Sequence, residues 1–247
     1  MFTRDEIKET ATALEEKTAE EILQWAHTTF HRKAVIATSF GLEDQAITQM
    51  ACQTFSNPIF FTLDTGRLPQ ATYDLMQTTR ERYHINIEIC FPEAQEVAEM
   101  VEKYGPNLFY QSVDLRRRCC EVRKVNPLKK YLKDKAAWIV GLRREQGITR
   151  NNIKKVEWDE SLNIVKIAPL ADWSQERTWD YINKNKIPYN KLHDQGYTSI
   201  GCSPCTRAIK PGEDLRAGRW WWENPENKEC GIHIVDGKVK RVAKVNQ

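Results

Sequence analysis

Ala34-Val35-Ile36-Ala37-Thr38-Ser39-Phe40-Gly41-Leu42-Glu43-Asp44 joins a short apolar run to a turn of small residues, and a helical pattern continues from it to Gln53. The first four residues have the length and composition of a strand buried in a parallel sheet. A strand that leads through such a turn into a helix N-terminus forms a cradle suited to a phosphate group. The stretch therefore predicts an α/β fold with an anion site beside this strand.

Strand and helix patterns alternate on both sides of this stretch. Apolar runs predict strands at residues 59–63, 85–89, 137–140 and 164–167, and periodicity predicts helices at residues 69–82, 93–103, 120–132 and 174–184. Two helices are expected at the start, because Thr3 with Glu6 and Thr18 with Glu21 have the spacing of capping boxes. The order predicts a doubly wound, mostly parallel sheet that binds ligands beyond the carboxyl ends of its strands.

Two more loops at predicted carboxyl ends carry polar side chains. Leu63-Asp64-Thr65-Gly66 ends the strand at 59–63, and residues 141–146 follow the strand at 137–140. Within the second loop, Arg143 and Arg144 offer guanidinium groups suited to bidentate contacts with oxyanions. We therefore expect both loops to border the ligand site.

The 247 residues are 40% hydrophobic and carry a net charge of +3. No apolar run approaches the roughly 18 residues of a membrane span, and residues 1–30 are too charged for a secretory signal, so we expect a cytoplasmic protein. Periodicity is lost after Ile187, which predicts an α/β domain over residues 1–205 and an irregular tail over residues 206–247. The segment from Leu115 to Lys135 contains nine basic residues and two acidic ones, which fits either a solvated helix face or an anion site.

Four of the seven cysteines form two pairs, Cys119-Cys120 and Cys202 with Cys205. Adjacent thiols are poorly placed for an unstrained disulfide, whereas four thiolates from two segments can hold zinc or an iron–sulfur cluster. Adjacent ligands count against zinc, and a pair so late in the chain counts against a thioredoxin-like redox motif. The spacing alone leaves a cubane cluster, zinc and unliganded thiols open.

A further cysteine lies in Lys228-Glu229-Cys230-Gly231-Ile232-His233. Neighbouring cations favour the thiolate, which is the nucleophilic form, and Gly231 allows the segment to move. Alone, the hexapeptide fits an ordinary exposed cysteine on a tail better than a nucleophile. Taken together with the other motifs of the chain, however, the hexapeptide fits a nucleophilic cysteine better.

Residues 39–44, 63–66, 118–124, 201–205 and 229–233 together closely resemble the assimilatory adenylyl-sulfate (APS) reductases, which belong with the phosphoadenylyl-sulfate (PAPS) reductases. The motifs keep the family's order and similar spacing from about Val35 to His233. The resemblance implies an adenine nucleotide alpha hydrolase-like fold and reduction of APS to sulfite and AMP, with thioredoxin as electron donor. It also implies a place in sulfate assimilation and cysteine biosynthesis, and a homo-oligomer, because the family is often dimeric or tetrameric.

The resemblance also implies roles for individual residues. Cys230 would attack the sulfate sulfur and form an S-sulfocysteine, assisted by Lys124 and His233. The implied ligands of a [4Fe-4S] cluster are Cys119, Cys120, Cys202 and Cys205. The implied substrate-binding residues are Ser39, Phe40, Gly41, Glu43, Asp44, Leu63, Asp64, Thr65, Gly66, Arg216 and Arg219.

Three other functions stay open. PAPS-specific relatives generally lack the cysteine pairs, which favours APS, but some members that carry the cluster accept both substrates. An ATP pyrophosphatase such as a cluster-dependent tRNA thiolase would need a Ser-Gly-Gly-x-Asp-Ser loop, where this chain has Phe40 and Glu43 crowding the second phosphate. A redox sensor that binds nucleic acid lacks a recognised motif, so we expect no nucleic-acid or membrane partner.

Several conspicuous residues are expected to be structural. The three tryptophans at residues 220–222 are expected to pack the tail on the sheet rather than stack on adenine. His193 has no identifiable partner, and Cys52 and Cys90 lie in apolar patterns of the predicted core.

Overall fold

Among the residues that the structure describes, six strands pair into one sheet in the order β3-β2-β1-β4-β6-β5. The structure is a computed structural model that describes residues 4–147 and 150–224. All neighbours are parallel except β5 and β6, which are antiparallel, so the predicted doubly wound, mostly parallel sheet is confirmed. The strands are β1 (Ala34–Ala37), β2 (Phe60–Leu63), β3 (Ile87–Cys90), β4 (Ala137–Ile139), β5 (Val156–Asp159) and β6 (Ile164–Ile167).

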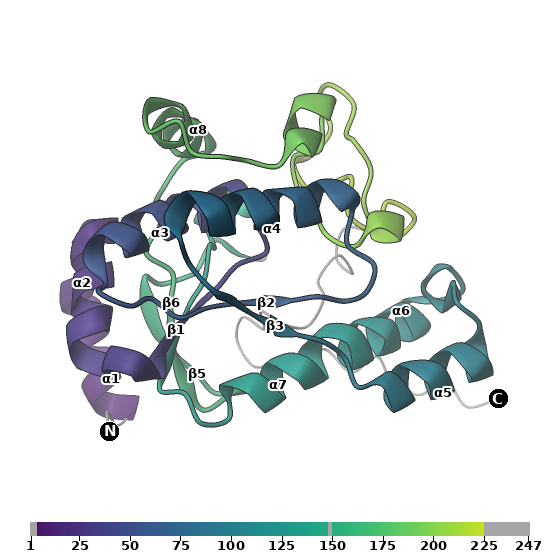
Figure 1. Cartoon of the computed structure of the whole chain (residues 1–247), viewed down its shortest axis with the longest axis horizontal. Coiled ribbons are helices and arrows are strands. Elements are labelled where there is room, and N and C mark those ends of the chain that lie inside the picture. The colour runs from purple at the N-terminus through teal and green to yellow at the C-terminus, as the bar shows by residue number, and fades with distance from the viewer. Residues whose placement is uncertain (1–3, 148–149, 225–247) are drawn as a thin grey trace.

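Helices cover both faces of this sheet. Figure 1 shows the strands between a layer that contains α3 and α4 and a layer that contains α5, α6 and α7. In β1, Ile36 packs in the cluster that includes α2 and α3, whereas Val35 packs in the cluster that includes α7, as the two-residue period of a strand requires. The helices are α1 (Arg4–Leu14), α2 (Ala19–Phe30), α3 (Leu42–Thr54), α4 (Gln70–Tyr83), α5 (Ala94–Tyr104), α6 (Val113–Cys120), α7 (Asn126–Leu132) and α8 (Gln175–Lys184).

The local signals at two helix N-termini are confirmed. Thr18 Oγ1 accepts from the Glu21 N–H at 3.2 Å and Glu21 Oε2 accepts from the Thr18 N–H at 2.8 Å, which completes the capping box of α2. Ser174 caps α8 as predicted. Thr3 lies outside the described residues.

Two elements differ from the sequence prediction. Strand β5 was not predicted, because its Glu157 and Asp159 break the apolar pattern, and pairing with the buried strand β6 decides its conformation. The helix expected to begin near Cys120 begins at Val113 instead, because Ser112 Oγ accepts from the Leu115 N–H and caps α6. Three consecutive arginines masked the periodicity of that helix.

The strand order reverses between β1 and β4, where the chain returns to the centre of the sheet. Loops that follow these two strands therefore meet at one edge, which is where doubly wound sheets bind ligands. Among the described residues, no helix has the length and apolar character needed to cross a bilayer.

Candidate functional site

A cavity of about 240 Å³ lies at the carboxyl ends of β1, β2 and β4, where the strand order reverses. Loops after β1 and β4 form part of its wall, and segments of the chain between residues 193 and 220 close it. Basic side chains outnumber acidic ones on this wall, which suits an anionic ligand. The charged side chains that line it are Glu43, Asp44, Lys124, Arg143, Arg150, Arg216 and Arg219.

The predicted phosphate loop turns sharply between β1 and α3. Phe40 has a positive φ of 61°, and its side chain packs in the main core with 1% of its surface exposed. The sequence suggested that Phe40 binds substrate and crowds the place of a second phosphate, but its side chain lies in the core and does not line the cavity. Five residues of the loop do reach the cavity, namely Ser39, Gly41, Leu42, Glu43 and Asp44.

Asp44 is a buried carboxyl group inside this loop. Its Oδ2 accepts hydrogen bonds of 2.7 Å from both N and Oγ of Ser39. Burial nevertheless raises the pKa of Asp44 to about 6, since removal from water penalises the carboxylate more than these bonds favour it. A side chain at Gly141 would collide with Asp44, so glycine is what allows the loop after β4 to approach the loop after β1.

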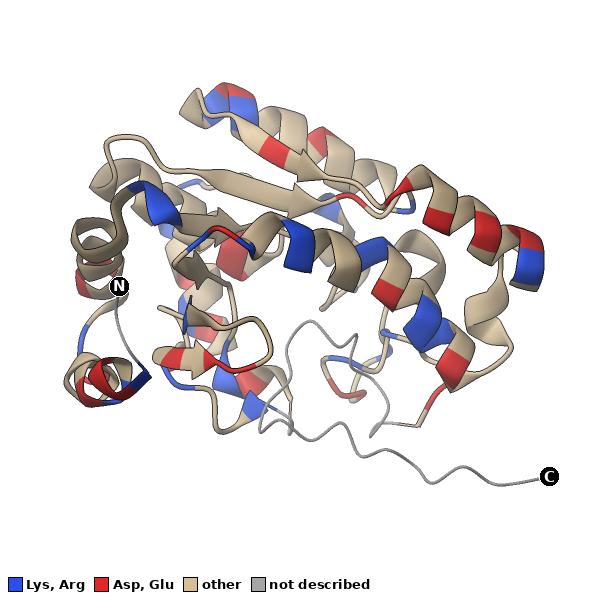
Figure 2. Cartoon of the chain, turned by 90° about the horizontal axis from the view of Figure 1, so that it is seen from below, with Lys and Arg blue, Asp and Glu red and all other residues tan. Residues whose placement is uncertain are grey.

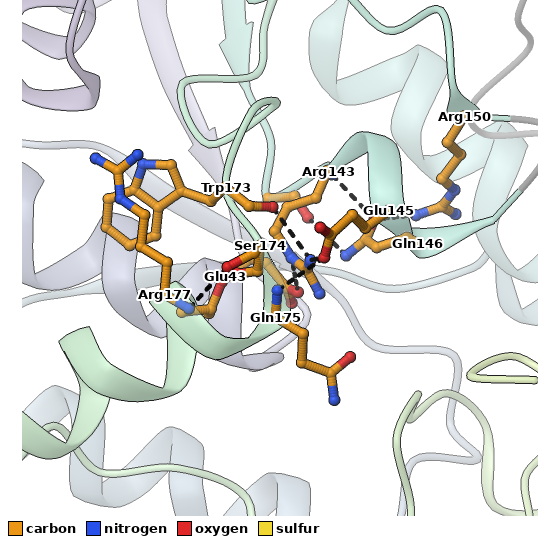
Figure 3. A network of polar contacts seen from close by, with 11 residues as sticks. Glu43, Arg143, Glu145, Gln146, Arg150, Trp173, Ser174, Gln175 and Arg177 are labelled. Atoms are coloured by element: carbon orange, nitrogen blue, oxygen red, sulfur yellow. Dashed lines mark hydrogen bonds and ion pairs between the residues drawn. The ribbon is translucent and has the colours of Figure 1, made fainter. Parts of the chain in front are cut away.

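Arg143 ties three loops together at the edge of the cavity (Figure 3). Its Nε donates to Glu43 Oε1 at 2.7 Å and its Nη1 donates to the carbonyl of Trp173 at 3.3 Å. Arg143 is 3% exposed, so this pair is removed from water and fixes the loops after β1 and β4 relative to each other. Arg144 does not line the cavity, because it donates to the Ile153 carbonyl and pairs with Glu15 instead.

The sequence analysis gave no role in the site to two titratable residues of the cavity wall, Arg150 and His193, and expected His193 to be structural. Arg150 lies next to Gln146, to whose Oε1 its Nη1 donates at 2.5 Å, and His193 lies on a short 3₁₀ helix, Lys191–Gln195. Both come from irregular segments whose path is set by tertiary packing. A lone arginine and a lone histidine in such segments carry no spacing from which a site could be predicted.

The four paired cysteines meet in a second, smaller pocket beside the cavity. Cys119 and Cys120 come from the end of α6, and Cys202 and Cys205 come from a loop more than 80 residues later. In the described part of the chain no disulfide joins any of the four, and all four pack in one apolar cluster with Trp220. Lys124, Arg219 and Trp220 line both the cavity and this cysteine pocket, so the two sites share a wall.

A π-helical turn, Glu121–Val125, follows Cys120 directly and leads into α7. Its wider turn allows Arg123 and Lys124 to face the same pocket as Cys119 and Cys120. Arg123 Nη1 also donates to the Thr65 carbonyl at 2.7 Å, which fastens the loop after β2 to this turn. π-Turns of this kind frequently occur at functional sites.

The loop after β2 lies between the two pockets. Leu63 lines the cavity, whereas Thr65 Oγ1 lies 3.2 Å from Cys202 Sγ at the cysteine pocket. Asp64 Oδ1 accepts from the Gly66 N–H at 2.8 Å and from the Tyr73 hydroxyl at 2.9 Å, so it shapes the loop.

Charges around the thiols act on them unequally. Burial works against the Cys202 thiolate, but the Lys124 charge, the Thr65 hydrogen bond and further arginines outweigh it and lower the pKa of Cys202. Burial, together with the nearby Cys202, raises the pKa of Cys205 to about 12. One thiolate is thus favoured in a pocket that disfavours a second, unless a metal group takes up the charge.

These residues fit an iron–sulfur cluster by donor type and number. Four thiols from two segments, enclosed by apolar side chains and bordered by cations, form the usual ligand set of a cubane. In the part of the chain that the structure describes, no group of three or more His, Cys, Asp or Glu has the arrangement that holds a metal ion.

The described end of the chain is anchored against the cysteine pocket. Arg116 of α6 donates from Nε and Nη2 to both carboxylate oxygens of Glu223, at 2.9 and 2.7 Å, and both side chains are almost fully buried. The guanidinium also lies over the Trp220 ring, 4.7 Å from its centroid. Trp220 and Trp222 thus pack in the cluster of the cysteine pocket rather than on the sheet, and Trp221 is exposed. Cys230 and His233 lie outside the described residues.

The basic run between residues 115 and 135 does not form a single charged face. Arg118 pairs with Glu121 at 2.8 Å and Lys130 pairs with Glu93 at 2.5 Å. Figure 2 shows basic and acidic segments interspersed over the helices. Part of the run is therefore a solvated helix face, whereas Arg123 and Lys124 turn inward to the cysteine pocket.

Fold and site together define an adenine nucleotide alpha hydrolase-like α/β protein with a thiol pocket beside its ligand cavity. Residues 33–208 match the phosphoadenosine phosphosulfate reductase domain. The chain belongs to this family, as the sequence motifs predicted.

Individual relatives cover most of the chain. It is 50% identical over 199 residues to the adenosine 5′-phosphosulfate reductase of Allochromatium vinosum, a match that spans 81% of this chain and 78% of the relative. It is 44% identical over 225 residues to the protein of the same name from Neisseria meningitidis serogroup B, spanning 90% and 91%. The phosphate complex of phosphoadenylyl-sulfate reductase from Candida auris matches with a TM-score of 0.72 at 29% identity, covering 85% of this chain and 98% of that one.

Proposed function

We propose that the protein reduces APS to sulfite and AMP. The observation that carries this proposal is the wall shared by a basic cavity and a pocket of four thiols. Relatives that cover most of the chain are named adenosine 5′-phosphosulfate reductase, which supports APS as the substrate. In this role the protein serves sulfate assimilation and cysteine biosynthesis in the cytoplasm, as a homo-oligomer.

The nucleophile in this proposal is Cys230, carried by a tail that begins after residue 205. Its thiolate attacks the sulfur of APS, a sulfur–sulfur bond forms, and the bond from sulfur to the bridging phosphate oxygen breaks. AMP leaves with that electron pair, and Cys230 becomes an S-sulfocysteine. A thioredoxin thiolate then attacks Cys230 Sγ and releases sulfite, and the second thioredoxin thiol resolves the mixed disulfide, so the dithiol supplies both electrons.

Cations are needed because a thiolate must approach an anion. Lys124, Arg216 and Arg219 line the cavity and supply positive charge toward the phosphosulfate, with His233 of the tail added in the proposal. Each well-placed group contributes about 2 to 4 kcal/mol to the transition state, judged from the removal of single oxyanion donors. Arg143 contributes less, because its charge is already paired with Glu43.

Cys119, Cys120, Cys202 and Cys205 are the residues that would hold a [4Fe-4S] cluster. When bound, the cluster would supply negative charge beside the cavity. Lys124, which lines both pockets, would then offset the repulsion between that charge and the phosphosulfate.

The test is intact-mass spectrometry of the reduced, anaerobically purified protein after incubation with APS or with PAPS, followed by peptide mapping. One SO₃ added to Cys230 with APS alone is the expected result. Addition from both nucleotides would assign a dual APS/PAPS reductase instead. If protein that retains its iron gains no SO₃ from either nucleotide, the proposal is wrong.

A further inference from the structure

His193 lines the cavity but has no role in the chemistry proposed above. Its ring is held in place: Nδ1 lies 2.6 Å from the carbonyl oxygen of Tyr197, and Trp179 packs against it edge to face with ring centroids 5.8 Å apart. Its other ring nitrogen, Nε2, is buried and has no hydrogen-bond partner among the described residues. A buried polar atom left in this way is uncommon and calls for an explanation.

The Tyr197 contact determines what Nε2 can do. A carbonyl oxygen only accepts, so Nδ1 must carry the proton of that hydrogen bond. Burial lowers the pKa of His193 and favours the neutral imidazole, although the hydrogen bond to the Tyr197 carbonyl and the charges of Glu43 and Asp194 act in the opposite direction. In that tautomer Nε2 has a lone pair and no proton, so it is an acceptor.

The turn that carries His193 is itself fixed to the cavity wall. Asn190 Oδ1 accepts from the Leu192 N–H at 3.1 Å, and Asn190 Nδ2 donates to Thr72 Oγ1 at 3.0 Å. Asn190 is 1% exposed and Thr72 lines the same cavity. The position of His193 relative to a ligand is therefore set by buried contacts rather than by an exposed loop.

One oxygen of each carboxylate on this wall already accepts a hydrogen bond from the protein. Glu43 accepts from Arg143, and Asp44 accepts from Ser39, whereas the arginines and Lys124 are donors. Donors serve the phosphate and sulfate oxygens of a nucleotide, but its amine and hydroxyl groups need acceptors. His193 Nε2 supplies the complementary chemistry.

We propose that His193 recognises the adenosine moiety by accepting a hydrogen bond at Nε2 from an N–H or O–H donor of the nucleoside. This inference rests on the proposed function only in that the cavity binds an adenosine nucleotide. Two sources share this chemistry, the exocyclic amine of the base and the hydroxyls of the ribose. His193 is thus a specificity residue and takes no part in sulfur transfer.

The test is calorimetric titration of the reduced, iron-loaded protein with AMP, 2′-deoxy-AMP, 3′-deoxy-AMP and purine riboside 5′-monophosphate, which lacks the amine. His193→Gln keeps an acceptor near the position of Nε2, and His193→Met has a similar length without a comparable one. We expect the wild type and H193Q to bind AMP about tenfold more tightly than one analogue, and H193M to lose that difference for the same analogue alone. The analogue concerned identifies the donor. His27→Phe, at a histidine outside the cavity, is expected to leave every affinity unchanged.

Three results would overturn the inference. If H193M keeps the wild-type ratio for every analogue, Nε2 makes no contact with the nucleoside. If H193Q and H193M weaken all four nucleotides equally, His193 only supports the fold of the wall. If AMP does not bind to the wild type at all, the cavity is not a nucleotide site, and both this inference and the proposed function are wrong. The first two results would leave the proposed reduction of APS intact.

Discussion

Glu223→Gln should destabilise the protein by about 3 to 5 kcal/mol, because it removes the carboxylate that neutralises the buried Arg116 charge. Arg116 has 0% and Glu223 2% of the side chain exposed, and the pair is bidentate with distances of 2.9 and 2.7 Å. Water can therefore neither screen the pair nor replace the lost carboxylate. The Trp220 ring stays over the guanidinium, but a ring face compensates a full charge only in part.

The assay is urea unfolding of reduced protein, with iron content measured on the same samples. Arg118→Ala provides the matched control on the same helix, since Arg118 and Glu121 are about half exposed and their pair should contribute less than about 1 kcal/mol. The double variant Arg116→Met, Glu223→Leu should recover most of the loss, because no charge remains buried. A loss below 1 kcal/mol for E223Q, or a double variant no better than the single one, would refute this reasoning.

Three further predictions concern the two pockets. Lys124→Ala should slow S-sulfonation of Cys230 by about two orders of magnitude while iron content stays near that of the wild type; equal loss of both would show that Lys124 only supports the cluster site. Cys205→Ser should remove most of the bound iron, measured by absorbance and metal analysis, whereas Cys52→Ser, at a half-buried cysteine outside the pocket, should not; unchanged iron in C205S would contradict the ligand assignment. The raised pKa of Asp44 means that the folded state holds its proton more tightly than the unfolded chain, so the contribution of Asp44 to stability should be greatest below about pH 4 and should fall by up to about 3 kcal/mol as the pH rises to about 6. Asp44→Asn should flatten that part of the pH dependence in urea unfolding, and an unchanged slope would mean that another group produces it.

Local sequence patterns predicted the centre of the fold because, in β1 and α3, the local composition and the turn residues agree with the burial that the fold imposes. The apolar run at residues 34–37 is buried on both sides, and Gly41 begins the helix as the small-residue turn suggested. The same agreement holds at Thr18, where both bonds of the capping box form. Elements with such consistent signals can be predicted without knowledge of their neighbours.

The parts that were missed depend on contacts between distant segments. Strand β5 exists because β6 lies beside it, and the π-turn after Cys120 has no sequence signal of its own. Arg143 and Arg144 are adjacent and chemically identical, yet one pairs with Glu43 at the cavity and the other with Glu15 away from it. Adjacent side chains point in different directions, and the sequence alone does not show which of them faces the cavity.

The shared wall explains why basic residues that follow both cysteine pairs in the sequence come back to the cysteines in the fold. Lys124 follows the first pair, Arg219 follows the second pair, and both line the cavity and the cysteine pocket. Two anionic groups that bind side by side repel each other unless cations lie between them, and that repulsion is strong where water is excluded. A cation between them lowers the energy of both, so each group should favour the binding of the other. We therefore expect filling of the cysteine pocket and binding of an anionic nucleotide to be coupled through the same two side chains.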